Sequence, residues 1–190
     1  RSLPVELSHD DIIAATRNWL EKAVIGLNLC PFAKSVYVKD QVRIVISDAK
    51  DPATLLEHLM VELRLLADSE PEEVDTTLLV HPYVLQRFLD FNDFLEIADA
   101  ALADMGLEGT LQVADFHPKF QFAGTTINDV SNNTNRSPFP TLHLIRESSI
   151  ERAVEAFPDA ATIYERNIAL MQEMGRDGWE ALNVGAPKAK

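Results

Sequence analysis

The sequence has a single cysteine among its 190 residues and no long apolar run. One cysteine excludes an internal disulfide framework and a cysteine-rich zinc cluster. No run approaches the roughly 18 apolar residues that a membrane-spanning helix needs. The first residues, RSLPVELSHDD, lack the apolar core of a secretory signal. These absences favour a cytoplasmic protein without a membrane partner.

Basic charge is also scarce, because 17 Lys and Arg stand against 30 Asp and Glu, for a formal net charge of -13. Nucleic acids are bound by clustered Lys and Arg, and no such cluster occurs, so the sequence disfavours a nucleic acid partner. No GxGxxG, Walker, GxSxG or HExxH motif is present. The sequence therefore argues against a nucleotide cofactor, an α/β-hydrolase and a zincin.

The composition that remains, 46% hydrophobic and 25% charged, is that of a globular protein. Hydrophobic periodicity predicts one domain over residues 8–175 and a weakly structured tail over 176–190. Expected helices cover about 9–27, the region after 51, 84–105, 148–157 and 159–174, and expected strands cover 42–47, 76–80, 111–116 and 141–147.

This order of strands and helices predicts an α/β fold, with α+β as the alternative class. We expect a small, mostly parallel sheet of four strands with crossover helices, plus helices at both termini. Crossovers between parallel strands place their carboxyl ends at one edge of the sheet, where open α/β sheets bind ligands. A ferredoxin-like split βαβ arrangement of the same strands is the competing topology.

Three polar residues lie at the carboxyl ends of the first three strands, namely Ser47, His81 and His117. If the fourth strand runs antiparallel to the third, its start at 140–143 reaches the same edge, with the 118–140 loop folded over it. Loops longer than about 12–15 residues are usually functional or disordered. This loop carries several Phe residues, which disordered segments avoid, so we expect an ordered loop above a pocket.

The candidate catalytic groups are His117, Asp115 and Cys30. An imidazole titrates near neutral pH, so His117 suits a general acid or base, and Asp115, two residues earlier on the same strand face, could orient the ring. Cys30 before Pro31 could be an N-cap thiol with a stabilised thiolate and act as a nucleophile. The structural alternatives are a histidine that satisfies backbone groups and an ordinary buried cysteine.

The candidate ligand-binding groups are Arg136, Asn135, Ser137, His81 and His143. The Arg136 guanidinium offers a planar fork to a carboxylate or phosphate, and Asn135 and Ser137 could position a ligand. Asn and Ser also stabilise turns, and Arg136 could instead pair with an acid or cap loop carbonyls. His143 alternates with Leu142 and Leu144 and is expected to face away from them.

These residues support three hypotheses. The first is a small-molecule enzyme, of transferase or hydrolase type, that binds a small polar or anionic metabolite under the 118–140 loop. The second is a divalent metal site formed by His81, His117 and His143 with Asp115 or Cys30. The third is a non-catalytic ligand- or partner-binding module, which is favoured if Phe side chains fill the expected pocket.

Several segments resemble a known family: IGLNLCPFAK at 25–34, TTLLVHP at 76–82, LEGTLQVADFHPKFQFAG at 107–124, NNTNRSPFPTLHLIRE at 132–147 and ERNIALM at 165–171. They are similar to the bacterial family known as domain of unknown function 1415, over about residues 10–175. The resemblance implies a bacterial cytoplasmic protein and no particular reaction. The family pattern draws attention to Cys30, Pro31, His117, Pro118, Asn135, Arg136, Ser137, Pro138, His143, Arg166 and Asn167.

Overall fold

The computed structural model describes residues 7–187 of the chain. Its elements in chain order are α1 (His9–Trp19), the π-helix η1 (Leu20–Ile25), α2 (Ala33–Val38), β1 (Val42–Ile46), α3 (Pro52–Asp68), β2 (Thr76–Val80), α4 (Phe88–Asp104), β3 (Leu111–Phe116), the 3-10 helix η2 (Val130–Asn135), β4 (Thr141–Arg146), α5 (Glu147–Ala156) and α6 (Ala160–Ala181). The strands and helices expected from periodicity are present.

The four strands form one open sheet in the order β1-β2-β4-β3. β1 and β2 pair in parallel, whereas β4 is antiparallel to both β2 and β3. β1, β2 and β3 therefore share one direction, and β4 is inserted between β2 and β3. The predicted α/β class and single domain are confirmed. The sheet is less parallel than expected, since β1 and β2 are the one parallel pair of neighbours among the described strands.

The crossover units explain where the ferredoxin-like alternative fails. β2, α4 and β3 form a split βαβ unit, because β4 lies between the two parallel strands. β1, α3 and β2 do not, because β1 and β2 are direct neighbours. A ferredoxin-like sheet needs both units to be split, so this topology is not formed.

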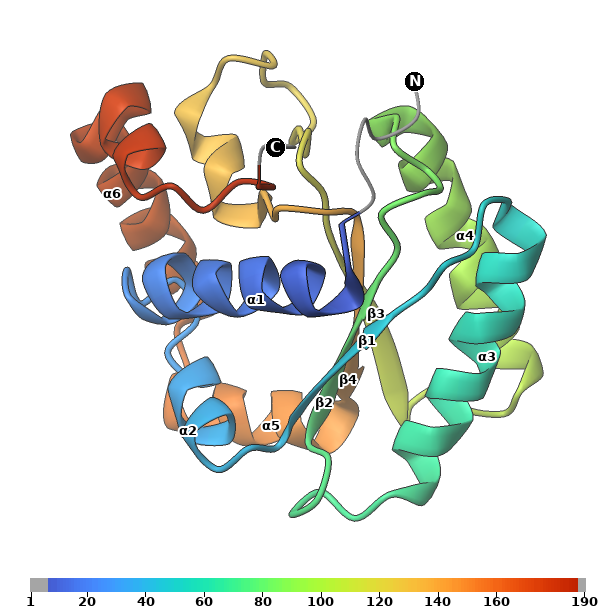
Figure 1. Ribbon diagram of the computed structural model, residues 1–190. Helices are drawn as coiled ribbons and strands as arrows, with labels where there is room; N and C mark the ends of the chain where they lie inside the picture. The colour runs from blue at the N-terminus through green and yellow to red at the C-terminus, as the bar shows by residue number, and fades with distance from the viewer. Residues whose placement is uncertain (1–6, 188–190) are drawn as a thin grey trace.

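The helices α3 and α4 cover one face of the sheet (Figure 1). Leu79 of β2 and Leu142 and Leu144 of β4 point to this face and are 0% exposed. They form the main core with the apolar stripes of both helices, which are Leu55, Leu59, Leu63 and Leu66 of α3 and Phe91, Phe94, Ala98 and Leu102 of α4. Full burial of such a side chain contributes about 1.5–3 kcal/mol, so this layer holds the sheet against its helices.

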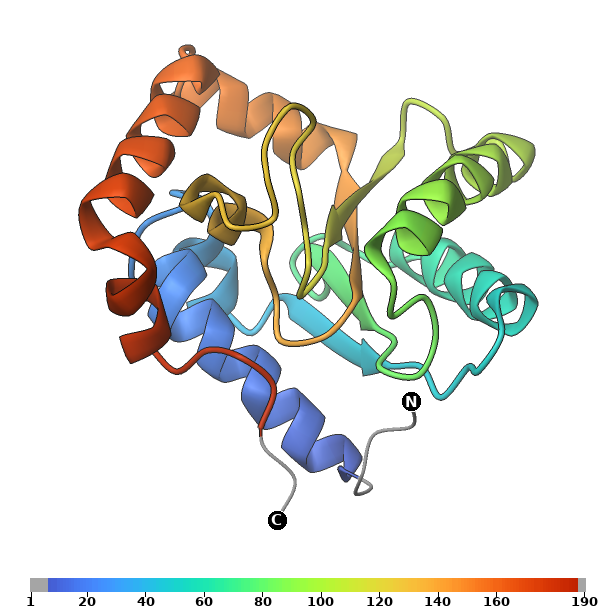
Figure 2. The same ribbon diagram turned by 90° about the horizontal axis from the view of Figure 1, so that it is seen from above.

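The opposite face of the sheet is covered by α1, η1, α2 and α5, as Figures 1 and 2 show from two directions. Ser8 and Asp11 form a capping box at the start of α1. Trp19, Leu20 and Val24 then pack toward Leu78 of β2. The last helix, α6, lies outside this layer and packs against η2.

The first helix changes from α-helical to π-helical before it ends. The helix expected over 9–27 is α-helical to Trp19 and π-helical from Leu20 to Ile25. A Cβ at the next position, Gly26, would lie 2.4 Å from the backbone oxygen of Lys22, so glycine is required there on steric grounds. π-helical turns are frequent at functional sites. This one presents Leu20 and Val24 to the sheet.

The C-terminal segment differs from the expected weakly structured tail. α6 continues past Met174 to Ala181, with a kink at Gly175, where φ is 65°. Trp179 and Val184 pack into the apolar cluster around Trp19. Burial of these side chains orders residues 176–187 although two glycines precede Trp179. Residues 188–190 lie outside the described part of the chain.

Candidate functional site

A pocket of about 440 Å³ lies between the α1-facing side of the sheet and the helices that cover it. We call it the sheet pocket. Strand side chains form its floor, and its walls come from α1, η1, the 30–36 segment and α5. Its lining includes Trp19, Cys30, Asp75, Thr76, Leu78, Phe116, His143, Ser149, Arg152 and Ala153. Pockets of about 300–1,000 Å³ with apolar walls and few polar groups are typical small-molecule sites.

The alternation of side chains along the strands builds the floor of the sheet pocket. Leu78 of β2 and His143 of β4 are register partners, so both point away from the main core. Trp19 packs edge-on against Phe116 of β3, with ring centroids 5.0 Å apart. The Phe116 ring lies 5.8 Å from the imidazole of His143. An imidazole is therefore set among apolar side chains, and the predicted orientation of His143 away from its leucine neighbours is confirmed.

Thr76 holds the imidazole of His143. The Nε2 atom of His143 lies 2.8 Å from Oγ1 of Thr76, and this hydroxyl donates to the backbone oxygen of Leu144 at 2.7 Å. Desolvation by the apolar surroundings lowers the pKa of His143 to about 4. The ring is neutral at pH 7, so it can act there as a hydrogen-bonding group and not as a cation.

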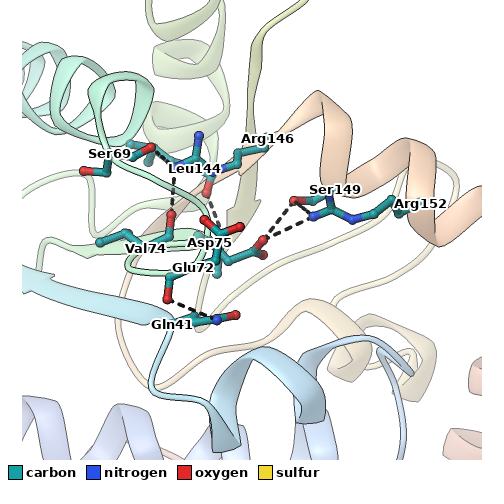
Figure 3. A network of polar contacts seen from close by, with 10 residues as sticks. Gln41, Ser69, Glu72, Val74, Asp75, Leu144, Arg146, Ser149 and Arg152 are labelled. Carbon is teal, nitrogen blue, oxygen red and sulfur yellow. Dashed lines mark hydrogen bonds and ion pairs between the residues drawn. The ribbon is translucent and has the colours of Figure 1, made fainter.

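The α5 wall of the sheet pocket carries an ion pair (Figure 3). Asp75 accepts a hydrogen bond from Oγ of Ser149 at 3.1 Å and pairs with Arg152 at 3.5 Å. Behind it, Arg146 donates to two backbone carbonyls of the connector before β2, at 2.8 and 2.7 Å. Because Arg152 offsets the charge of Asp75, this pair adds little net charge to the pocket.

Cys30 lies in the turn between η1 and α2 and lines the sheet pocket. The residue is exposed. The sequence suggests that Cys30 is the N-cap of the helix that follows. In the structure α2 begins at Ala33, and Phe32 occupies the cap position. The prediction of an N-cap thiolate is therefore wrong. The chain makes one further turn after Pro31 before the helix starts, and the backbone oxygen of Cys30 accepts from the amide of Ala33 at 3.2 Å.

Two neighbouring side chains of α6 fix this turn. Arg166 donates to the backbone oxygen of Asn28 at 2.8 Å, and Asn167 donates to that of Leu29 at 2.9 Å. Asn28 has a φ of 54°, a left-handed conformation that asparagine tolerates better than most residues. The wall that carries Cys30 is therefore held from outside the pocket by a helix near the other end of the chain.

His81 and His117 lie close together at the strand ends, as the sequence predicts. Both rings pack against Phe91, with centroid distances of 5.7 and 5.0 Å. The amide of His81 donates to the backbone oxygen of Pro140 at 3.0 Å, which places the start of β4 at the same edge. Both histidines are 0% exposed, and Phe88 covers His117 at 5.5 Å. The edge is therefore sealed by phenylalanines.

Backbone groups engage both ring nitrogens of His117. Its Nε2–H donates to the oxygen of Leu85 at 3.0 Å, and its Nδ1 accepts from the amide of Lys119 at 3.0 Å. Burial lowers the pKa of this imidazole. Asp115 makes no hydrogen bond to the ring, so its predicted orienting role is not found; burial and the nearby Asp99 raise the pKa of its carboxyl. These contacts favour a structural role for His117.

The proposed metal triad is not brought together. His143 lies on the opposite face of the sheet from His81 and His117. Within residues 7–187, no group of three or more His, Cys, Asp or Glu side chains is arranged to hold a metal ion. Nδ1 of His81 bonds to the oxygen of Val84 at 3.1 Å, and burial lowers the pKa of His81 to about 4. Its ring is thus a neutral part of the core at pH 7.

The 118–140 loop is ordered around the guanidinium of Arg136. Its Nε donates to the oxygen of Phe120 at 3.1 Å and its Nη2 to that of Ile127 at 2.8 Å. Its Nη1 donates to Oδ1 of Asn133 at 3.4 Å. Arg136 therefore ties three points of the loop together, which is the carbonyl-capping role that the sequence left open.

Asn135 and Ser137, the two predicted positioning groups, also serve the loop. The side-chain amide of Asn135 donates to the oxygen of Asp115 at 3.4 Å, and its backbone oxygen accepts from the amide of His117 at 3.2 Å. Oγ of Ser137 donates to the oxygen of Phe139 at 2.6 Å. Their turn-forming role accounts for these contacts.

A second pocket, of about 350 Å³, lies between this loop and the C-terminal part of the described chain, and we call it the loop pocket. Its wall includes Asp129, Asn133, Arg136, Arg176, Trp179 and Glu180. Arg176 pairs with Glu180 at 3.1 Å. Over the described residues, no carboxylate lies within ion-pair distance of Arg136.

Residues 11–181 match the family described as "Protein of unknown function (DUF1415)". The chain belongs to this family. The DUF1415 match runs from α1 to the end of α6, so it includes every wall of the sheet pocket. No curated protein and no solved structure matches the chain. Among the helices of residues 7–187, none combines the length and the apolar character that crossing a membrane requires.

The sequence predicts Cys30 and His143 as site residues but places them with His117 at the strand-end edge, whereas both line the sheet pocket. Two signals in the sequence point to this other face of the sheet. Thr76 and Leu78 lie on the face of β2 that is not used by Leu79, and the Trp19 stripe of the first helix needs an apolar partner. Together these patterns predict a second packed face behind the sheet. They do not predict that its packing leaves a pocket.

Proposed function

We propose that this DUF1415 protein is a small-molecule binding module whose ligand is compact, mostly apolar and held in the sheet pocket. The observation that carries this proposal is a pocket of about 440 Å³ whose floor and walls are mainly apolar. Removing apolar surface from water stabilises a complex by about 25 cal/mol per Å². A ligand that covers Leu78 and the Trp19 and Phe116 rings gains this energy without needing a charged partner.

This proposal replaces the function that the sequence favoured. The sequence favoured a polar or anionic metabolite and an acid–base role for His117. The Phe88 and Phe91 rings fill the strand-end edge, which is the condition that favours a non-catalytic binding module. Both nitrogens of His117 are engaged by backbone groups, so a proton transfer there would first have to break hydrogen bonds.

A neutral fluorescent probe, N-phenyl-1-naphthylamine, tests the proposal. We expect saturable binding with a blue-shifted emission. Ala153 of α5 lines the pocket, so Ala153→Phe should fill it and weaken binding by at least about tenfold. Val154, the next residue, is 50% exposed. Val154→Phe is the matched control and should change affinity by less than about twofold. Equal binding by both variants, or no saturable binding by the unaltered protein, would contradict the proposal.

A second candidate keeps the polar or anionic ligand and places it in the loop pocket. The observation that favours it is the guanidinium of Arg136, which lines this pocket without a carboxylate partner in the described chain. A charged group that is partly desolvated is stabilised by an anion at its free N–H groups. Isothermal titration with inorganic phosphate tests this candidate, and Arg136→Lys should then reduce the affinity. Absence of a saturable heat would remove the candidate.

A further inference from the structure

Resting on the proposed function, we infer that the ligand of the sheet pocket carries a neutral hydrogen-bond donor, a hydroxyl or N–H group, which bonds to Nδ1 of His143. The site would then take an apolar alcohol, phenol or heteroaromatic N–H compound in preference to a carboxylate or a plain hydrocarbon.

The Thr76 hydroxyl carries a single hydrogen. Oγ1 of Thr76 lies 2.7 Å from the backbone oxygen of Leu144, which can only accept. The hydroxyl hydrogen must therefore point to Leu144. The contact of 2.8 Å between the same oxygen and Nε2 of His143 then requires Nε2 to be the donor. In the neutral ring this leaves the lone pair, and no hydrogen, on Nδ1.

Nδ1 of His143 is the ring nitrogen that remains for a ligand. No group of residues 7–187 makes a hydrogen bond to this atom. The surrounding protein also does not enclose it fully. Because His143 lines the sheet pocket, Nδ1 is the one of its two ring nitrogens that is left for a ligand. In the nearby carboxylate of Asp75, Oδ1 is engaged by both Ser149 and Arg152. Desolvation lowers the pKa of the imidazole and keeps it neutral, so Nδ1 stays an acceptor at pH 7.

Ligand groups differ in whether they can donate a hydrogen to Nδ1. A hydroxyl or N–H group pairs with the lone pair, and a neutral hydrogen bond of this kind contributes about 0.5–1.5 kcal/mol, or up to roughly tenfold in affinity. A hydrocarbon leaves the acceptor unpaired after burial. A carboxylate brings its own lone pairs against Nδ1 and is repelled at long range by a chain of net charge -13.

Three naphthalene derivatives of equal ring size make the test: 2-naphthol, 2-methoxynaphthalene and 2-naphthoate, each competed against N-phenyl-1-naphthylamine. We expect 2-naphthol to bind about two- to tenfold tighter than the methyl ether, and 2-naphthoate to bind weakest. His143→Phe removes the acceptor and should abolish the preference for the naphthol. Thr76→Val frees the ring to adopt either tautomer and should reduce the preference.

The possible failures are distinguishable. Equal binding of the naphthol and its methyl ether, or tightest binding of the naphthoate, overturns this inference and leaves the proposed function standing. No binding of any of the four compounds overturns both. Nitrogen-15 spectra of the imidazole in the unaltered protein give an independent readout, which does not depend on whether the variants fold. We expect Nε2 protonated and Nδ1 unprotonated at pH 7, and the opposite tautomer would overturn the inference.

Discussion

The side-chain amide of Asn167 donates a hydrogen bond of 2.9 Å to the backbone oxygen of Leu29, one residue before the exposed Cys30. The two residues are 138 positions apart in the chain, and Asn167 does not line the sheet pocket. The contact fixes a pocket wall from behind, together with the neighbouring bond from Arg166 to Asn28.

Asn167→Ala should therefore act on the pocket at a distance. Loss of the bond leaves the Leu29 oxygen without its partner, and we expect a destabilisation of about 1–2 kcal/mol in urea unfolding. Affinity for N-phenyl-1-naphthylamine should fall severalfold, because the 28–32 turn loses a support. Gln172→Ala, at an exposed position of the same helix, is the control. An unchanged dye affinity in Asn167→Ala would show that the turn does not need this bond.

Gly26→Ala tests the end of the π-helix. The added Cβ would lie 2.4 Å from the oxygen of Lys22, a contact that requires the backbone to move. Overpacking of this kind typically costs about 1–3 kcal/mol, and we expect that loss in urea unfolding. Within residues 7–187, a Cβ added at Gly185 would meet no atom closer than 4 Å, so Gly185→Ala should stay within about 0.5 kcal/mol of the original protein. Similar stability of the two variants would contradict the steric account.

Arg136→Lys separates the two roles considered for this side chain. Lysine keeps the charge but cannot hold the Phe120 and Ile127 oxygens and the Asn133 side chain at once. We expect a loss of about 1–3 kcal/mol and a melting temperature lower by several degrees, measured by calorimetry. Arg176 pairs with Glu180 at the surface of the loop pocket, which Arg136 also lines. The control Arg176→Lys should have a melting temperature close to that of the original protein. A stable Arg136→Lys with weakened phosphate binding would instead support an anion site.

The stability of the protein should fall in mild acid because of His81. Burial lowers the pKa of His81 to about 4, below the ordinary 6.5, so the folded state favours the neutral ring. Its contribution is complete above about pH 6.5 and declines as the pH falls toward 4, since the unfolded chain then binds a proton that the folded chain does not. We expect His81 to account for roughly 2–3 kcal/mol between pH 7 and 4.5.

Urea unfolding at pH 7, 5.5 and 4.5 measures this effect. His81→Asn keeps a donor for the oxygen of Val84 but cannot titrate in this range, so its stability should depend less on pH than that of the unaltered protein. Parallel pH profiles for the two proteins would contradict the buried neutral histidine. His143, whose pKa is lowered to about 4 by desolvation, contributes in the same window and remains in both proteins.

The local patterns of the sequence predict most elements, because each element carries its own periodicity and end signals. Ser8 with Asp11 and Asp51 with Pro52 are local helix-start signals, and α1 and α3 begin directly after Ser8 and Asp51. The position of β4 between β2 and β3 has no such local signal, since it depends on which strand edge pairs with Thr141–Arg146. Strand order is a property of the whole sheet.

The candidate site is harder to predict. The sequence identifies hydrogen-bond donors, but it does not identify the acceptors to which they bind. The sequence shows that Arg136 carries a planar set of N–H donors. In the structure these groups donate to backbone oxygens of the 118–140 loop. The convergence of His81 and His117 followed from strand direction. Their burial under Phe91 depends on how α4 crosses the sheet end, which periodicity does not encode.

The insertion of β4 between β2 and β3 also affects how the chain folds during its synthesis. During synthesis β1, α3 and β2 can pair as soon as they emerge, because they are neighbours in both chain and sheet. Among the described strands β3 pairs only with β4, so it must wait until Thr141–Arg146 has left the ribosome. Until then the nascent chain exposes an unpaired edge of β2, and such edges attract other chains. Completion of the sheet is therefore a late, long-range event, and we expect it to be slow relative to helix formation.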